Sequence, residues 1–245
     1  MKVAIISDAH GNLEATEAVL ADIEKNANPD EIWFLGDSVG YGPQPSDVLS
    51  LIRENASIIL RGNHDTALFD PQSFDDLNPR ARVALEWTKE RIGEQDVDFL
   101  RKLPVFREDE ENRVLLCHAS PHEPSEWHYI FTDEDAERAF SATESPIIIT
   151  GHSHLPLCFT RKKGITSQVR GPEALSLNPD ARYLLNPGSV GQPRDGDPRA
   201  SYAVLDTEAG RFSVRRVEYD VRAVAKKIAD SGLPLFLAER LFVGL

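Results

Sequence analysis

The sequence predicts an α/β protein built on parallel strands, and three observations support this fold class. The chain has 245 residues, of which 41% are hydrophobic and 27% are charged, as in globular proteins that bury a sizeable core. Its first third alternates short β-branched apolar runs with stretches of helical spacing. A strand–helix–strand–helix–strand order places the strands parallel, with right-handed crossovers. Because no repeat, low-complexity tract or linker interrupts the chain, we expect a single domain over residues 1–245.

The first third contains five expected elements. Its opening run is apolar at consecutive positions, as in a strand that is buried on both faces. Ser46 or Asp47 is expected to cap the second helix, because both side chains can accept hydrogen bonds from free backbone N–H groups. The five elements are a strand over Lys2–Ser7, a helix over Leu13–Lys25, a strand over Glu31–Leu35, a helix over Pro45–Ile52 and a strand over Ser57–Leu60.

Helical patterns and short apolar runs continue through the rest of the chain. Short turns separate several of the later strands, which we therefore expect to be antiparallel. The stretch Gly164–Pro179 has no clear period and is expected to be an exposed loop. We expect helices over Pro79–Ile92, Gln95–Leu103, Thr132–Thr143, Val221–Ala229 and Pro234–Val243, and strands over Arg113–Cys117, Pro146–Thr150, Pro156–Arg161, Arg182–Leu185, Ser201–Asp206 and Phe212–Tyr219.

Charge and cysteine content exclude several classes of protein. With 27 Lys and Arg against 40 Asp and Glu, the net charge is −13, which argues against non-specific binding of nucleic acids or anionic membranes. No apolar run approaches the roughly 20 residues of a membrane span. The apolar start ends at Ser7-Asp8, too early for a secretory signal. Cys117 and Cys158 are expected to be buried free thiols, which places the protein in the cytoplasm.

Polar clusters follow five of the predicted strands. In parallel α/β sheets, ligands bind outside the carboxyl ends of the strands, so we expect these clusters to meet at one edge. Five of the seven histidines belong to them. The clusters are Asp8-Ala9-His10, Gly36-Asp37, Gly62-Asn63-His64-Asp65, His118 and Gly151-His152-Ser153-His154.

The side chains in these clusters suit divalent metal ions. Imidazole nitrogens, carboxylates and an amide oxygen together favour manganese, iron, zinc or nickel. The candidate ligands outnumber the four to six positions around one ion, so a two-metal site that activates water against a phosphate accounts for them better. The candidates are Asp8, His10, Asp37, Asn63, His118, His152 and His154.

The order and spacing of these motifs resemble the calcineurin-like metallophosphoesterase superfamily. The resemblance covers about residues 2–155 and implies a four-layer αββα sandwich. Two mixed β-sheets would be flanked by helices, with a binuclear metal site at the C-terminal edge of the strands. The later motif Asn186-Pro187-Gly188-Ser189-Val190-Gly191 is similar to that of small bacterial and archaeal phosphodiesterases of the YfcE-like kind.

The resemblance also implies a role for each motif residue. Two divalent ions, manganese first among the candidates, would be bridged by Asp37. A metal-activated hydroxide would attack phosphorus in line, without a covalent phosphoenzyme. His64 would protonate the leaving-group oxygen, oriented by Asp65. One ion would be held by Asp8, His10 and His154, and the other by Asn63, His118 and His152.

At one position the sequence differs from neighbouring branches of the superfamily, and this difference narrows the range of expected substrates. Phosphoprotein phosphatases and diadenosine tetraphosphatases carry an arginine in the segment after the Gly-Asp motif, where this chain has Tyr41. A dianionic monoester gains more from an arginine clamp than a monoanionic diester does, so we expect a small phosphodiester, with a nucleotide among the candidates. Tyr41 could stack on a base or pack against Pro43. Arg194 could supply the guanidinium or lie in a solvated turn, which keeps a phosphomonoesterase as an alternative.

A second alternative is an interaction scaffold without catalysis, because some members of this superfamily act in that way. Such members typically lose the general-acid histidine, whereas His64 is present here. The apolar stretches Leu233–Leu237 and Leu241–Val243 could cover a partner, form a homodimer interface or pack on the protein's own sheet.

Overall fold

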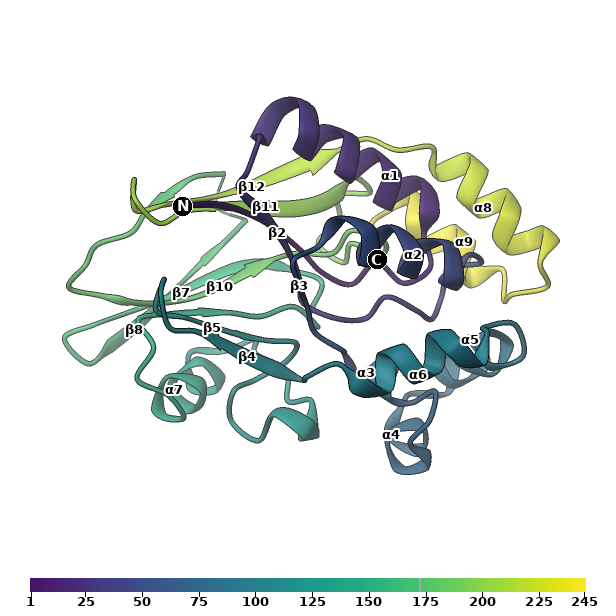
Figure 1. Ribbon diagram of the computed structural model, residues 1–245, viewed down its shortest axis with the longest axis horizontal. Helices are drawn as coiled ribbons and strands as arrows, with labels where there is room; N and C mark the ends of the chain where they lie inside the picture. Colours follow the sequence, from purple (N-terminus) through teal and green to yellow (C-terminus); the bar gives the residue numbers. More distant parts are fainter. Residues whose placement is uncertain (172) are drawn as a thin grey trace.

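The computed structural model describes residues 1–171 and 173–245, and its strands form two six-stranded sheets (Figure 1). The first sheet has the order β3 (Ile58–Ile59), β2 (Glu31–Phe34), β1 (Lys2–Ile6), β11 (Ala200–Asp206), β12 (Arg211–Val217) and β9 (Leu175–Ser176). The second sheet has the order β4 (Phe106–Asp109), β5 (Val114–Cys117), β6 (Ile147–Ile149), β10 (Arg182–Pro187), β7 (Pro156–Lys162) and β8 (Ile165–Arg170).

The two sheets pack face to face, and β1 shows how its sequence serves both of its faces. Val3 and Ile5 point into the core between the sheets, where they belong to one cluster with Leu116 of β5. Ala4 and Ile6 point the other way and belong to the cluster that α1 and α2 cover. Successive side chains of a strand point to opposite faces, so an uninterrupted apolar run is the pattern of a strand between two covering layers.

Helices cover the outer faces. On the first sheet lie α1 (Leu13–Asp22) and α2 (Pro45–Asn55), and on the second lies α7 (Asp133–Ser141). The expected sandwich of two mixed sheets flanked by helices is therefore confirmed.

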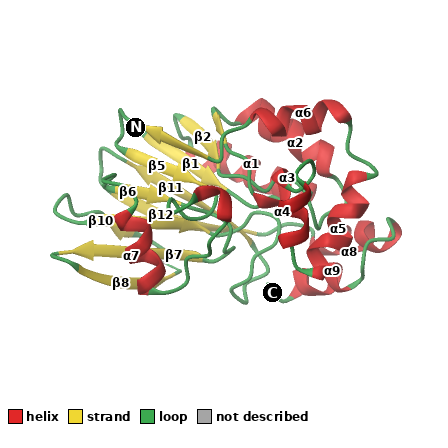
Figure 2. Ribbon diagram, turned by 90° about the horizontal axis from the view of Figure 1, so that it is seen from below, coloured by secondary structure: helices red, strands yellow, loops and turns green. Residues whose placement is uncertain are grey.

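The remaining helices gather to one side of the strands, as Figure 2 shows. They share an apolar cluster that includes Leu85, Leu100, Val224 and Leu237. These helices are α4 (Pro71–Asp76), α5 (Pro79–Lys89), α6 (Glu94–Lys102), α8 (Val221–Asp230) and α9 (Phe236–Glu239), and the short α3 (Asn63–Thr66) leads into the same cluster through Ala67.

Strand directions follow the expectation in both sheets. The first three strands pair in parallel, as do β5 and β6, whereas β7 and β10, and β11 and β12, pair antiparallel. In addition, β10 runs parallel to β6. After the β7–β8 hairpin the chain forms β9 in the first sheet and then returns to the second sheet as β10, between β6 and β7.

Some local expectations were wrong. The stretch Gly164–Pro179, whose residue 172 lies outside the described residues, contains β8 and β9 rather than only an exposed loop. Because β8 is the outermost strand of its sheet and exposes Ile165, it lacks the alternation of a half-buried strand. The edge strand β4 was missed for a similar reason, since it is largely exposed.

Two helix ends also differ from the expectation. Gln44 occupies the N-cap of α2 without a side-chain hydrogen bond, and Pro45 starts the helix, so neither Ser46 nor Asp47 caps it. Prolines suit this first position because the helix needs no N–H there. The segment expected as one helix from Pro234 divides into α9 and a 3₁₀ turn over Arg240–Phe242.

Both cysteines are buried and free, as expected. Burial raises the pKa of the Cys158 thiol to about 11. Among the described residues, no helix has the length and apolar character needed to cross a membrane.

Candidate metal centre

The five polar clusters meet at one edge of the sandwich. Asp8 and His10 follow β1, Asp37 follows β2, and Asn63 with His64 starts α3 after β3. From the second sheet, His118 follows β5, while His152 and His154 follow β6. All of these side chains are buried, the most exposed being Asn63 at 8%. The site therefore lies where the ends of the two sheets come together.

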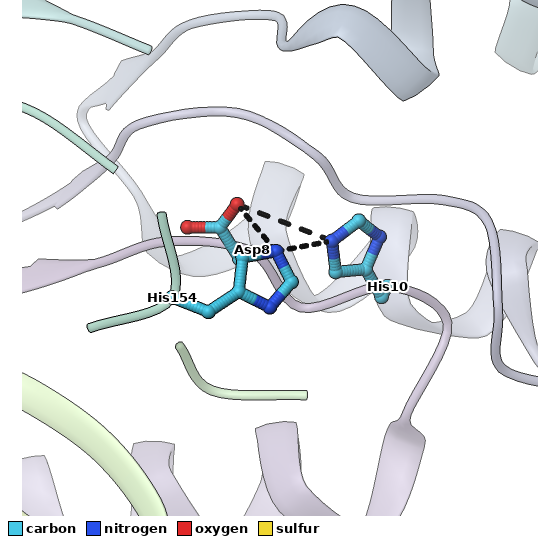
Figure 3. Close-up of side chains that lie close together, drawn as sticks. All are labelled: Asp8, His10 and His154. Atoms are coloured by element: carbon cyan, nitrogen blue, oxygen red, sulfur yellow. Dashed lines mark hydrogen bonds and ion pairs between the residues drawn. The ribbon is translucent and has the colours of Figure 1, made fainter. Parts of the chain in front are cut away.

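Three groups of side chains place their donor atoms within 4.8 Å of one another and could each hold a metal ion. The first is Asp8, His10 and His154, which point toward one another in Figure 3. There, His154 Nε2 lies 3.3 Å from Asp8 Oδ1 and 3.1 Å from His10 Nε2. The other two groups are Asp37, His118 and His152, and His10, Asp37 and His64.

Asp37 belongs to two of these groups. Its Oδ1 accepts a hydrogen bond from the backbone N–H of His64 at 2.9 Å. Its Oδ2 lies 3.6 Å from His10 Nε2 and 3.5 Å from His118 Nε2. Asn63 joins on the His118 side, with its Oδ1 3.2 Å from His118 Nε2. The Asp37 carboxylate thus lies between two donor groups, the one that contains Asp8, His10 and His154 and the one that contains His118 and His152.

Backbone carbonyls orient three of the imidazoles. His10 Nδ1 donates to the Val39 carbonyl at 2.9 Å, and His118 Nδ1 donates to the Leu35 carbonyl at 3.0 Å. His154 Nδ1 donates to the Gln192 carbonyl at 2.6 Å. A carbonyl can only accept, so the Nδ1 atom of each ring carries a proton, which in the neutral imidazole leaves the Nε2 lone pair for a metal.

Buried polar atoms without partners provide a test of whether these residues fit metal ions. Asp8 Oδ1 and His152 Nε2 are buried and have no hydrogen-bond partner within the described ranges 1–171 and 173–245. The other Asp8 oxygen accepts the backbone N–H of His152 at 3.1 Å. Unpaired buried acceptors are costly, and a bound cation would satisfy both atoms. The donor set of imidazoles, carboxylates and an amide fits the expected divalent ions.

Burial controls the charge of the first donor group. It holds the pKa values of His10 and His154 well below the usual range, and the Arg194 guanidinium lowers them further. These imidazoles are therefore neutral, as metal ligation requires. Burial also raises the pKa of Asp8 to about 7.

In the group of Asp37, His118 and His152, neighbouring charges oppose the effect of burial on the pKa values. Burial lowers the pKa of His118, but the Asp37 carboxylate outweighs it and raises that pKa to about 9. Burial raises the pKa of Asp37, but the neighbouring His118 and His64 hold it well below its usual range. Asp37 is therefore an anion that attracts positive charge.

The backbone of these loops is strained. Left-handed conformations at residues other than glycine cost about 1–3 kcal/mol each and cluster at functional sites. They occur with φ values between 47° and 63° at Asp8, His10, Asp37, His152 and His154. The turns that aim these side chains inward are therefore maintained at the expense of stability.

Asp65 was expected to orient His64, but its contacts differ. Its carboxylate accepts hydrogen bonds from the N–H groups of Asp37 at 2.8 Å and Gly62 at 3.0 Å, and from the hydroxyl of Ser38 at 2.7 Å. Asp65 thus ties the loop after β2 to the loop after β3. His64 Nδ1 is buried without a hydrogen-bond partner among the described residues.

A cavity of about 820 Å³ opens over the donor groups. Asp37, His64 and His152 form part of its lining. Tyr129 was not among the expected site residues, yet its ring stacks on that of His152 with 4.0 Å between centroids. Trp127 also lines the cavity, with its ring 5.9 Å from that of His118. Both residues lie in the loop that follows His118, which is the one sequence signal that could have indicated them.

The two residues considered for substrate contact lie together. Tyr41 is 6% exposed and its ring is 4.6 Å from that of His64. The Arg194 guanidinium lies over the Tyr41 ring at 5.9 Å, and both residues line the cavity. Arg194 is thus a half-buried residue of the cavity wall, and the two residues that follow it are exposed.

Comparison with known proteins agrees with this arrangement. Residues 1–210 match the calcineurin-like phosphoesterase superfamily domain. The chain belongs to this superfamily. Members use divalent metal ions, and the His and Asp groups described above are candidates to hold them.

Two relatives match the chain over nearly its whole length. An uncharacterized protein of Methanocaldococcus jannaschii is 39% identical, and the match covers 99% of this chain and 98% of the relative. The crystal structure of a metallophosphoesterase from Sphaerobacter thermophilus is 38% identical, with a TM-score of 0.86 and coverage of 100% and 99%.

A third relative matches only in part. The symmetrical bis(5′-nucleosyl)-tetraphosphatase of Erwinia tasmaniensis is 30% identical over 129 residues, which cover 49% of this chain and 44% of the relative. The chain thus spans about half the length of this tetraphosphatase.

Proposed function

We propose that this calcineurin-like phosphoesterase is a metal-dependent phosphodiesterase that hydrolyses small phosphodiesters. The observation that carries the proposal is the position of the Asp37 carboxylate. It lies between two groups of nitrogen and oxygen donors and lines a cavity that can admit a substrate. A single ion would leave one of these groups unused.

The donor groups assign ligands to two ions, with manganese first and iron, zinc or nickel as alternatives. One ion would be held by Asp8, His10 and His154, and the other by Asn63, His118 and His152, with Asp37 shared. When bound, such ions activate water and neutralise phosphoryl oxygens. The carbonyls of Val39, Leu35 and Gln192 would keep the imidazoles aimed at them.

His64 is the candidate general acid. It lines the cavity, and it adjoins Asp37 through its backbone N–H. Its ring could therefore deliver a proton to the leaving-group oxygen. Because His64 also belongs to the donor group with His10 and Asp37, the alternative role for His64 is that of a metal ligand. Asp65 would support this site by holding the two loops together.

The cavity supports a substrate with an organic substituent. Its volume of about 820 Å³ exceeds what a phosphate needs, and Tyr129, Trp127 and Phe69 give it aromatic walls. Aromatic walls suit a nucleoside or another planar group. The partial match to a bis(5′-nucleosyl)-tetraphosphatase makes a nucleotide a reasonable first choice. Two buried free thiols favour the cytoplasm as its location.

A phosphomonoesterase is the second candidate, because Arg194 brings a guanidinium to the cavity beside Tyr41. A guanidinium there could clamp the extra charge of a monoester.

The deciding experiment compares bis-p-nitrophenyl phosphate with p-nitrophenyl phosphate. Metal-stripped protein is assayed with added Mn, Ni, Zn or Mg. Metal-dependent cleavage that is faster for the diester supports the proposal, and faster cleavage of the monoester favours the second candidate. If neither ester reacts while two ions stay bound, an interaction scaffold is the better description. Light scattering after size exclusion would then test a homodimer through the exposed Leu235 and Phe242.

A further inference from the structure

Arg194 stands at the start of a loop beside the metal centre. Its Nη2 donates to Gln192 Oε1 at 3.0 Å, and the Gln192 carbonyl accepts from the candidate ligand His154. The Arg194 Nε is buried and has no hydrogen-bond partner in the described part of the chain. The guanidinium thus lies beside the cavity, at a position set by the loop that follows it.

Residues beyond 210, where the match to the superfamily domain ends, hold the loop over residues 194–197 in two places. Arg216 of β12 forms an ion pair with Asp195, and the Arg216 side chain is only 16% exposed. The Gly196 N–H donates to the Gly244 carbonyl at 2.9 Å. The Gly244 segment is itself anchored, because Arg240 Nε donates to the Leu245 carbonyl and Leu241 is buried.

Gly244 lies close against the backbone of Asp197 in this loop. Its φ is +63°, and a Cβ built on it would lie 2.6 Å from the backbone of Asp197. Any side chain would therefore force the loop over residues 194–197 to shift, besides straining the backbone at Gly244. The contact is backbone against backbone, so no flexible side chain can yield to relieve it.

We propose that Gly244 is a positioning residue for Arg194, whose guanidinium contacts the phosphoryl oxygens of the substrate. This inference rests on the proposed function. Neighbouring branches of the superfamily carry an arginine where this chain has Tyr41. In this protein, the Arg194 guanidinium lies over the Tyr41 ring and can take the place of that arginine, because the loop that Gly244 supports positions it there. Residues outside the family domain thereby complete the substrate-binding face.

The test compares Gly244→Ala with the control Gly232→Ala. Gly232 has a similar φ of +80°, but no atom of the described residues lies within 4 Å of its added Cβ. With bis-p-nitrophenyl phosphate and Mn, Arg194→Ala should lower kcat/KM about ten- to a hundredfold, as expected for a lost charge-assisted hydrogen bond. Gly244→Ala should lower it by at least about threefold, mainly through KM, with metal content unchanged, and Gly232→Ala should match the wild type.

A double-mutant cycle separates positioning from general damage. If Gly244 acts through Arg194, adding Gly244→Ala to the Arg194→Ala variant should cause no further loss. Losses that multiply, or a Gly244→Ala variant that behaves like Gly232→Ala, would overturn the inference while leaving the phosphodiesterase proposal intact. A wild type that cleaves neither nitrophenyl ester with any metal would overturn both.

A second variant covers the case in which Gly244→Ala does not fold. Arg216→Met removes the ion pair to Asp195 but retains an apolar stem for packing. Arg216→Met should also raise KM, and combining it with Arg194→Ala should cause no further loss of kcat/KM. If Arg216→Met leaves KM unchanged, the residues beyond 210 do not position the guanidinium.

Discussion

His118 Nε2 lies 3.5 Å from Asp37 Oδ2, and this approach joins the two sheets. Asp37 follows β2 of the first sheet and His118 follows β5 of the second. The His118 ring is fixed from the first sheet as well, because its Nδ1 donates to the Leu35 carbonyl. The candidate metal centre therefore forms only when the apolar faces of the two sheets have packed together.

Replacement of Asp37 by Asn should impair metal loading itself. The change removes the negative charge that two donor groups share, and it can turn an NH₂ group toward the imidazole nitrogens. We expect fewer than two ions per chain and a loss of affinity greater than about tenfold. Elemental analysis after dialysis measures both. Asp75→Asn is the control, since Asp75 is exposed on α4, and equal metal content in the two variants would contradict the bridging role.

Replacement of His64 by Ala should separate catalysis from metal binding. A general acid contributes about 10²–10⁴-fold, and most for a poor leaving group. The assay therefore uses a diester with an alcohol rather than a nitrophenol as leaving group. Both ions should remain bound. Unchanged turnover would contradict the general-acid role, and loss of an ion would instead identify His64 as a ligand of the group with His10 and Asp37.

Gly62→Ala should damage the metal centre without altering any candidate ligand. The added Cβ would lie 2.1 Å from Asp37 Oδ1 and 2.7 Å from the Asp37 nitrogen. We expect a loss of about 1–3 kcal/mol in the free energy of unfolding, as for other overpacked sites, together with lower metal content. Urea unfolding and elemental analysis measure the two effects. Gly93→Ala, where nothing lies within 4 Å, should retain its metal ions.

The start of α7 should show a pH-dependent stability. Asp135 accepts hydrogen bonds from the Thr132 N–H at 3.0 Å and from Arg138 at 2.7 Å. Partial burial raises the pKa of Asp135, but these partners outweigh it and lower the pKa to about 2. A depressed pKa stabilises the fold above the unfolded value of about 3.9, and that contribution is lost as the pH falls through 2.

Comparison of the wild type with Asp135→Asn tests this contribution. The Asp135 side chain is 21% exposed and its hydrogen bonds cap the first turn of α7, so we expect a difference of about 0.5–1 kcal/mol in the free energy of unfolding at pH 6. The difference should shrink between pH 4 and pH 2, as followed by urea unfolding. A difference that stays constant over this range would show that the Asp135 charge does not stabilise α7.

The chemistry of the site could be predicted from local sequence alone. Polar residues directly after buried strands must lie at a sheet edge, because the strand direction determines where each strand ends. Thus Asp8, Asp37 and His118 were expected together although they are far apart in the chain. The apolar run of β1 likewise predicts two covering layers, since successive side chains enter opposite faces.

What only the tertiary structure decided depends on contacts between distant segments. The positions of Tyr129 against His152, Arg194 over Tyr41 and Gly244 against the Arg194 loop follow from packing that no local pattern encodes. The edge strands β4 and β8 are assigned by backbone hydrogen bonds to their neighbours, because their exposed side chains lack a regular alternation. The sequence by itself thus determined which groups bear the chemistry, whereas the packing of the two sheets and of residues 211–245 decided how those groups face one another.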